Sequence, residues 1–193
     1  MGQCACMKLA SSAFKNEEPI PERYTAYGAE LSPPLIWNDV PEQAQTLVLV
    51  CDDPDAPNRP FIHWVVYNIP ADSTGLPEDL PFTKTPLDGM RQALNDYHTA
   101  GWGAPFPPPG PTHKYYFKLY ALDCDIPPGY GNDYHDVLRV MEGHVIEEAV
   151  LIGTYARPEP PRASPRMSGL CCARAEHGNR FVTPRKNSKS MLL

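Results

Sequence analysis

Two short segments combine ionisable side chains with a stiff backbone. The first, residues 52–57, reads Asp-Asp-Pro-Asp-Ala-Pro and leads into His63, and the second, residues 101–113, holds five prolines and ends in a histidine. Proline restricts φ, so the carboxylates of Asp53 and Asp55 are aimed by a rigid loop, in which one X-Pro bond is a candidate for the cis form. Such rigidity is typical of a preformed binding site.

The residue types in these segments suit an anion. His63 and His113 carry imidazoles with an ordinary pKa of about 6.5, and each ring can donate to a phosphate oxygen. A carboxylate such as that of Asp53 can hold the tautomer of a neighbouring ring or favour its charged form. Gly103 lets a ligand approach main-chain N–H groups closely. The pattern predicts an anion pocket that needs no lysine.

The same histidines and aspartates also fit a metal-dependent hydrolase, which we keep as the alternative function. The sequence has no His-x-x-x-His or Cys-x-x-Cys pair, no Gly-x-Ser-x-Gly elbow and no P-loop. We therefore expect a non-enzymatic binding protein without cofactor or metal. A third interpretation is an inhibitor that contacts only proteins and whose pocket is vestigial.

Each segment also has a plainer explanation. Asp and Pro favour turns without any ligand, and a histidine flanked by Ile62 and Trp64 is more often a hydrogen-bonded core residue. His98, His135, His144 and His177 are assigned to structure or solvent.

The elements that must position these side chains are mainly strands, because 24 prolines cut the chain into short pieces and exclude long helices from the first 130 residues. The stretch from His113 to Leu122 alternates with period two, which puts His113 and Tyr115 on one inward face. Asn132 or Asp133 can cap a helix that ends near Ala149. The strands predicted from apolar and β-branched runs are 46–51, 61–69, 114–122 and 150–155.

Charge divides the chain unevenly. Residues 157–193 carry eight basic and two acidic residues, a net +6, whereas residues 1–156 carry nine basic and 21 acidic residues, a net −12. An acidic body argues against nucleic acid as a partner, since binding to a polyanion depends on Lys and Arg. The basic segment is rich in Pro, Arg and Ser and is predicted to be disordered or loosely packed.

The positions of the cysteines and the lengths of the apolar stretches bear on the compartment of the protein and on membrane association. Four of the six cysteines lie near the two ends, and the predicted body holds only Cys51 and Cys124, which favours reduced thiols. No stretch approaches the roughly 18 apolar residues of a membrane-spanning helix, and residues 1–9 lack the apolar core of a secretory signal. We expect a cytoplasmic protein, and the sequence leaves its oligomeric state open.

Ordered motifs along the chain resemble one family, the phosphatidylethanolamine-binding proteins, and most closely its bacterial and archaeal Raf kinase inhibitor-like (YbhB/YbcL) branch. The resemblance covers roughly residues 14–157 and departs from the usual pattern at Trp102, Ala104 and Lys114, where the family has Tyr, Gly and Arg. The matching motifs are Ser-Pro-Pro-Leu at 32–35, Asp-Pro-Asp-Ala-Pro at 53–57, His-Trp-Val at 63–65, Gly-Trp-Gly-Ala-Pro-Phe-Pro-Pro at 101–108, His-Lys-Tyr at 113–115 and Gly-Thr-Tyr-Ala-Arg at 153–157.

The resemblance implies a mainly β fold, with a large central antiparallel sheet packed against a smaller one and few short helices, one of them near the C-terminus. It divides the chain into an N-terminal extension (1–13), the family domain (14–157) and a basic tail (158–193). It implies binding of phosphate-bearing groups, such as phospholipid headgroups, small molecules or phospho-residues, and regulation of a kinase or protease partner. The ligand-binding residues carried over by motif are Asp53, His63 and His113, with Asp55, Gly103, Pro107 and Tyr115 as walls.

Overall fold

Two β-sheets dominate the fold. The computed structural model describes residues 6–87 and 89–158, so the predicted basic tail lies outside the described residues except for Pro158. Within the predicted N-terminal extension, Lys8–Ala10 forms the first strand, β1. The large antiparallel sheet and the smaller sheet that the family resemblance implied are both present.

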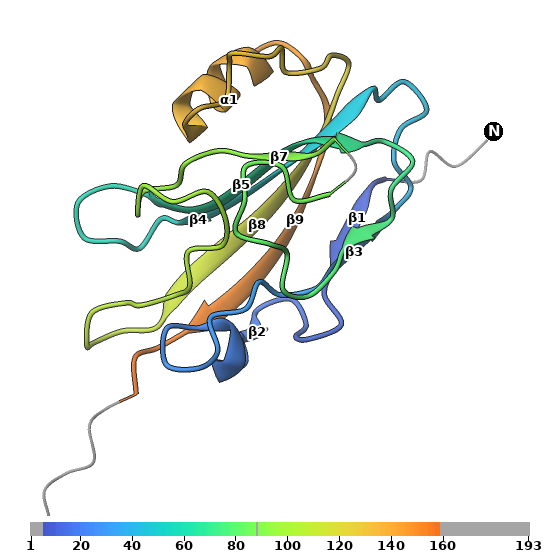
Figure 1. The fold of residues 1–193 in the computed structure, drawn as a ribbon. Coiled ribbons are helices and arrows are strands. Elements are labelled where there is room, and N and C mark those ends of the chain that lie inside the picture. The colour runs from blue at the N-terminus through green and yellow to red at the C-terminus, as the bar shows by residue number, and fades with distance from the viewer. Residues whose placement is uncertain (1–5, 88, 159–193) are drawn as a thin grey trace, which may run out of the picture. The chain divides into compact units, whose positions relative to one another are not determined.

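The large sheet has six strands in the order β2-β9-β8-β4-β5-β7, and all its neighbours are antiparallel except the short pair β2 and β9 (Figure 1). The three long strands of the sequence prediction are present, each extended by one or two residues. The strands are β2 (Glu18–Pro19), β4 (Thr46–Asp53), β5 (Phe61–Pro70), β7 (Arg91–Gln92), β8 (His113–Leu122) and β9 (Val145–Tyr155).

The strand β4 lies in the centre of this sheet and is buried along its whole length. Its residues alternate between two apolar clusters: Leu47 and Leu49 face one side of the sheet, and Val48 and Val50 face the other. A strand buried on both faces is a continuous apolar run, which is how residues 46–51 look in the sequence.

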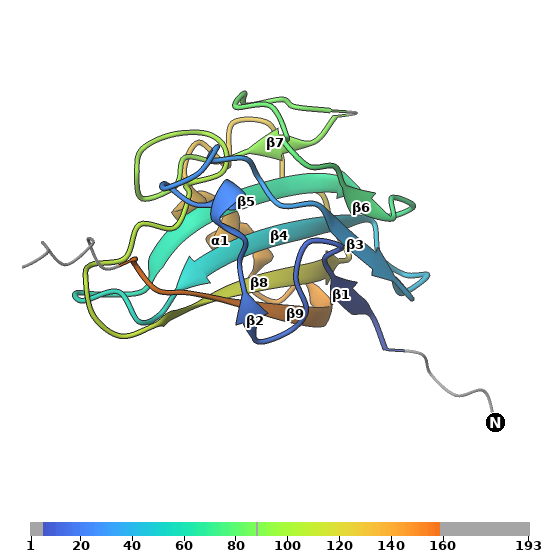
Figure 2. The same ribbon diagram turned by 90° about the horizontal axis from the view of Figure 1, so that it is seen from below.

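The smaller sheet covers one of these faces. It consists of β1, β3 (Leu35–Asn38) and β6 (Gly75–Leu76), in the order β1-β3-β6, and lies across the large sheet in Figure 2. Leu35 and Trp37 of β3 join the cluster that contains Leu49. A single turn of 3₁₀ helix, η1 (Glu22–Tyr24), also adds the buried side chain of Tyr24 to this cluster.

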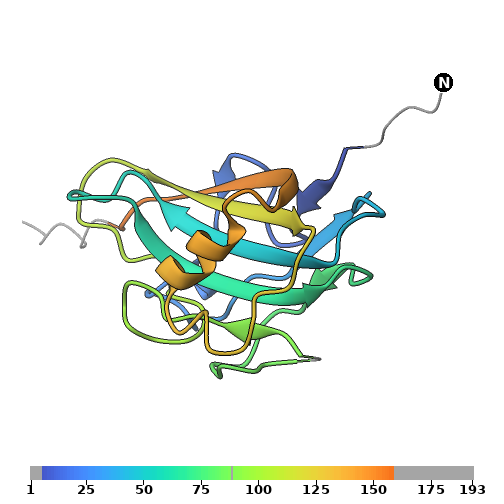
Figure 3. The same ribbon diagram turned by 90° about the horizontal axis from the view of Figure 1, so that it is seen from above.

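The opposite face is covered by α1 (Tyr134–Met141), the only α-helix among the described residues (Figure 3). Asp133 caps it as predicted, with its side chain accepting from the N–H of Asp136. The predicted extent is wrong, because the helix ends at Met141, and Val145, placed in that helix, already belongs to β9. Gly143 adopts a φ of 81° and stops the helix. No helix in the described part of the chain is long and apolar enough to cross a bilayer.

The double-sided burial of β4 makes its core contacts the main source of stability. We expect Leu49→Ala to lower the free energy of unfolding by about 3 kcal/mol, since a fully buried leucine is cut back to leave a cavity. Urea denaturation measures this loss. Ile36→Ala removes a branched side chain that is 52% exposed on β3 and should cost less than about 1 kcal/mol. Equal losses in the two variants would contradict this account of the core.

Candidate functional site

Four strands have one end each at the same end of the large sheet. Asp53 ends β4, Phe61 begins β5, His113 begins β8 and Tyr155 ends β9. The antiparallel registers pair Asp53 with Phe61 and His113 with Tyr155, so the loops 54–60 and 93–112 reach the same edge. Figure 1 shows both loops at the left end of the sheet. The two sequence segments singled out above are therefore neighbours in space.

The carboxylate of Asp53 links two of the predicted residues. The Nδ1–H of His113 donates to Asp53 Oδ2 at 2.7 Å, and both side chains are almost completely buried. The other oxygen, Oδ1, accepts from the main-chain N–H of Asp55 at 2.9 Å. Both oxygens of Asp53 are thus occupied. Among the described residues the Nε2 atom of His113 has no hydrogen-bond partner, which leaves it for a ligand.

His63 is fixed in a similar way. Its Nδ1–H donates to the carbonyl of Gly103 at 2.6 Å, so the residue that the sequence placed as a wall acts through its main chain. Burial among aromatic rings, with Tyr115 at 5.1 Å and Phe61 at 4.9 Å between centroids, lowers the pKa of His63. The hydrogen bond to Gly103 and the charge of Asp53 oppose this shift only in part. His63 is therefore neutral at neutral pH, with Nε2 as a proton acceptor.

A cavity of about 210 Å³ opens between these side chains. Five of the seven predicted site residues line it: Asp53, His63, Pro107, His113 and Tyr115. The lining residues not named by the sequence prediction are Ala56, Pro57, Phe61, Tyr97, Phe106 and Pro108.

The other two predicted walls lie elsewhere. The carboxylate of Asp55 accepts from the main-chain N–H of Lys114 and so connects the loop 54–60 to the start of β8. Gly103 lines a neighbouring cavity instead. The described residues contain no cis peptide bond, so the cis X-Pro bond considered for residues 52–57 is absent.

The hydroxyl of Tyr115 is the polar atom that the protein itself leaves without a partner here. It is buried and forms no hydrogen bond with the described residues, although its ring lines the cavity. Burial, followed by the nearby charge of Asp53, raises its pKa far above the ordinary value, so it stays a donor. An unpaired buried hydroxyl costs about 1–3 kcal/mol, and a ligand oxygen would remove that cost.

The loop that carries Tyr97 is held by Asn95, a buried residue with no evident sequence signal. The side-chain amide of Asn95 donates to the carbonyls of His63 and Gly101, and its oxygen accepts from the N–H groups of Tyr97 and Thr99. One amide thereby orders the turn and attaches it to β5.

A second set of polar contacts holds the loop 54–60. Arg59 forms a two-pronged ion pair with Asp96, at 2.6 and 2.9 Å, and Asp96 also accepts from the N–H of Ile62. Burial alone would raise the pKa of Asp96, but these hydrogen bonds and the charge of Arg59 hold it below its ordinary value. The walls of the cavity are thus fixed by polar contacts formed outside it.

Trp102, where the family pattern has Tyr, is anchored in the core. Its ring lies 5.6 Å from Trp64 and stacks on Phe117 at 5.8 Å, and its Nε1–H donates to the carbonyl of Tyr24. This anchor holds the start of the Pro-rich loop, so that Phe106 and Pro107 can project toward the cavity.

The atoms of the cavity do not form the cluster that a metal requires. In the described part of the chain, the group of three ligand side chains whose atoms lie within 4.8 Å of one another is Asp123, Cys124 and His144, at the far end of β8. His63 and His113 each donate from one ring nitrogen to a protein oxygen, which leaves Nε2 of each ring toward the cavity.

Comparison with protein families gives one match that covers most of the described chain. The family model described as phosphatidylethanolamine-binding protein matches residues 10–156. A UPF0098 protein of the archaeon Methanothermobacter thermautotrophicus is 50% identical over 153 residues, which are 78% of this chain and 99% of the relative. A UPF0098 protein of Aquifex aeolicus is 44% identical over 158 residues, covering 79% of this chain and 90% of the relative.

Solved structures agree with this match. YbcL of E. coli, described as a member of the mammalian PEBP family, superposes with a TM-score of 0.74 at 32% identity, covering 80% of this chain and all of YbcL. A homologue of phosphatidylethanolamine-binding protein from Chlamydia trachomatis gives a TM-score of 0.72 at 37% identity, covering 79% of this chain and 99% of that structure. The described part of the chain therefore shares its fold with these structures.

The buried, neutral His63 predicts a specific pH dependence of stability. In the unfolded chain its pKa returns to about 6.5, so below that pH the unfolded chain binds more protons than the folded one. The free energy of unfolding should fall as the pH drops from about 6.5 toward the lowered folded-state pKa, by at most about 1.4 kcal/mol per pH unit from this group. His63→Asn keeps an N–H donor for Gly103 without the titration.

Urea denaturation of both chains between about pH 7.5 and 5 measures the difference. Only the wild type has the titrating ring at position 63, so it should lose more stability than His63→Asn as the pH falls. Parallel pH profiles would show that His63 does not stay neutral in the folded protein.

Proposed function

The chain belongs to the phosphatidylethanolamine-binding protein family, and from this premise we propose that it is a non-enzymatic binding protein whose 210 Å³ cavity receives a phosphate-bearing group. The observation that carries the proposal is the unpaired, buried hydroxyl of Tyr115 beside the two imidazoles of His63 and His113. The imidazoles come from two strands and line one small space, and each has its Nε2 atom left for a ligand.

The hydrogen-bonding pattern suits a phosphate in particular. With Nδ1–H committed to a protein oxygen, a neutral His63 or His113 presents Nε2 as an acceptor, whereas Tyr115 presents a donor. The monoanion of a phosphate monoester has one O–H and that of inorganic phosphate has two, and both have acceptor oxygens, so either can satisfy both kinds of group. Protonation of an imidazole turns Nε2 into a donor, which strengthens binding of any anion.

The Asp53 carboxylate does not exclude an anion from this cavity. Its two oxygens accept hydrogen bonds from His113 and from the N–H of Asp55, so its charge is already solvated by the protein. A protonated His113 next to Asp53 forms a neutral pair, and an approaching phosphate meets the positive side of that pair. The acidic body of the protein raises the selectivity for a small anion over a polyanion.

The ligand class in this proposal is a phosphoryl group on an ethanolamine-type headgroup, a small molecule or a phospho-residue. The cavity volume fits such a group but not an acyl chain, so a lipid would enter only with its headgroup. We further propose that occupancy regulates a kinase or protease partner. Within the described residues Cys6, Cys51 and Cys124 form no disulfide with one another, which supports our proposal of a reducing, cytoplasmic location.

Calorimetric titration with inorganic phosphate and with phosphoethanolamine tests the proposal. Affinity should rise as the pH falls below about 6.5 toward the lowered pKa of His63, since a protonated ring donates to the anion. Phosphate itself gains a proton in this pH range, whereas sulfate keeps its charge. A rise in sulfate affinity with falling pH would therefore report protonation of the protein alone. Absence of any binding at about pH 6 would sink the proposal.

Variants of the histidines sharpen this titration. His113→Ala should weaken phosphate binding at least about tenfold, because a hydrogen bond to a charged group is lost. His113→Asn keeps an N–H donor for Asp53 and serves in place of the alanine variant if that variant folds poorly. It should show the same loss of phosphate affinity. The matched control is His135→Ala, which removes an exposed histidine of α1 and should bind phosphate like the wild type.

Tyr115→Phe separates binding from stability. It removes the unpaired hydroxyl, so the apo protein should become more stable while its phosphate affinity falls about tenfold. Tyr155→Phe is the matched control, because that hydroxyl is also buried and unpaired within the described residues but its residue does not line the cavity. It should gain stability with unchanged affinity. A Tyr115→Phe variant that binds phosphate normally would exclude this hydroxyl as a ligand donor.

A further inference from the structure

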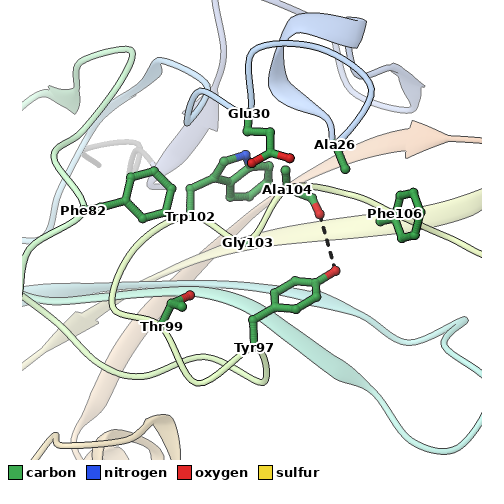
Figure 4. A pocket seen from close by; sticks show the side chains of 9 residues that line it. All are labelled: Ala26, Glu30, Phe82, Tyr97, Thr99, Trp102, Gly103, Ala104 and Phe106. Atoms are coloured by element: carbon green, nitrogen blue, oxygen red, sulfur yellow. Dashed lines mark hydrogen bonds between the residues drawn. The ribbon is translucent and has the colours of Figure 1, made fainter. Parts of the chain in front are cut away.

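A second, larger cavity of about 490 Å³ lies next to the first. Tyr97 and Phe106 line both cavities and so form the wall between them. The Tyr97 hydroxyl donates to the carbonyl of Ala104 at 3.5 Å, which ties this wall to the Pro-rich loop (Figure 4). Gly103 is required here, because a Cβ at this position would lie 2.6 Å from the ring of Tyr97.

Aromatic rings surround this second cavity. Phe82, Tyr97, Trp102 and Phe106 line it from different segments of the chain, and Figure 4 shows their rings arranged around a common space. The faces of aromatic rings attract cations that approach within about 6 Å. Phe82, Tyr97 and Phe106 are each about half exposed, so their rings are accessible to a ligand.

The rim already holds one organic cation. The guanidinium of Arg157 lies 5.0 Å from the centroid of Phe106 and 5.8 Å from that of Tyr27, and these two rings pack 5.6 Å apart. This contact shows that Phe106 is placed where a planar cation can stack on it.

A carboxylate sets the sign of charge that the cavity prefers. Glu30 lines it, as Figure 4 shows, and forms no ion pair with the described residues. The main chain on both sides is held, since the N–H groups of Ala29 and Leu31 donate to the carbonyl of Arg23. Glu30 and Tyr97 line the same cavity, and burial, followed by the charges of Asp53 and Glu30, raises the pKa of Tyr97.

We propose that this second cavity is a binding site for an organic cation, in which an ammonium group lies between the aromatic rings and the Glu30 carboxylate. The carboxylate disfavours anions, and the rings bind an alkylated ammonium better than a hydrated metal ion because its methyl groups are weakly solvated. The volume exceeds that of a single ammonium group, so the ligand has an apolar body as well. The site does not depend on phosphate binding in the first cavity.

Calorimetric titration with choline and with its uncharged carbon isostere, in which a tert-butyl group replaces trimethylammonium, tests this site. Choline should bind at least about tenfold more tightly than the isostere, because only the cation gains from the rings and the carboxylate. Equal affinities would show an apolar cavity without charge selectivity and would overturn the proposal.

Two variants locate the cation. Glu30→Gln should weaken choline binding about fivefold, the effect of one exposed charge pair, whereas Glu42→Gln removes the same charge from an exposed turn and should change nothing. Phe82→Leu keeps an apolar side chain without a π face and should weaken choline a few-fold while sparing the isostere. Unchanged choline affinity in both Glu30→Gln and Phe82→Leu would contradict the assignment.

The proposed phosphate site and the proposed cation site can be tested independently of each other. Choline binding should survive His113→Ala, and phosphate binding should survive Glu30→Gln. If His113→Ala abolished choline binding while Glu30→Gln left it intact, the cation would occupy the first cavity and the proposed second site would be wrong. Loss of phosphate binding alone would count against the proposed function and leave the cation site standing.

Discussion

The hydrogen bond between Asp53 and His113 joins residues sixty positions apart, and the rest of the site depends on it. It forms because β4 and β8 are antiparallel neighbours, with Asp52 paired to Tyr116, so that the last residue of one strand meets the first residues of the other. The apolar core holds that register, since a shift by one residue would turn the inward face of β8 to solvent. The site is thus stabilised by contacts made far from it.

The polar groups around the cavity differ in how many of their hydrogen-bond donors and acceptors have protein partners. This difference distinguishes the residues that hold the loops from the residue that we propose binds a ligand. Asn95, Asp96 and Asp53 use nearly every donor or acceptor on protein partners, as buried polar groups normally do. Tyr115 does not, although a different side chain at this position would avoid the cost of burying an unpaired hydroxyl. Residues in and around the cavity whose polar atoms are satisfied by the protein thus hold one unsatisfied residue in its lining, an arrangement typical of a preorganised site.

The two cavities share a wall but are lined by different polar groups. The first is lined by two imidazoles and the carboxylate of Asp53, and the second by the carboxylate of Glu30 and aromatic rings. Because Tyr97 and Phe106 belong to both, a change in either ring alters both spaces.

The sequence by itself determined the long strands, the helix cap at Asp133 and the family, because alternation, capping and ordered motifs are local properties of the chain. It also named His63 and His113, whose imidazoles can donate to an anion, and Asp53, whose carboxylate can orient such a ring. Only the tertiary structure decided that Asn95 orders a loop, that Tyr97 and Phe106 divide two cavities and that Gly103 faces the second. Those roles follow from where an irregular loop of twenty residues packs, and its course depends on contacts distant in sequence, such as Trp102 against Trp64 and Phe117. The helix end near Met141 was missed for a related reason, since residues after Gly143 keep an apolar pattern but gain more by pairing with β8.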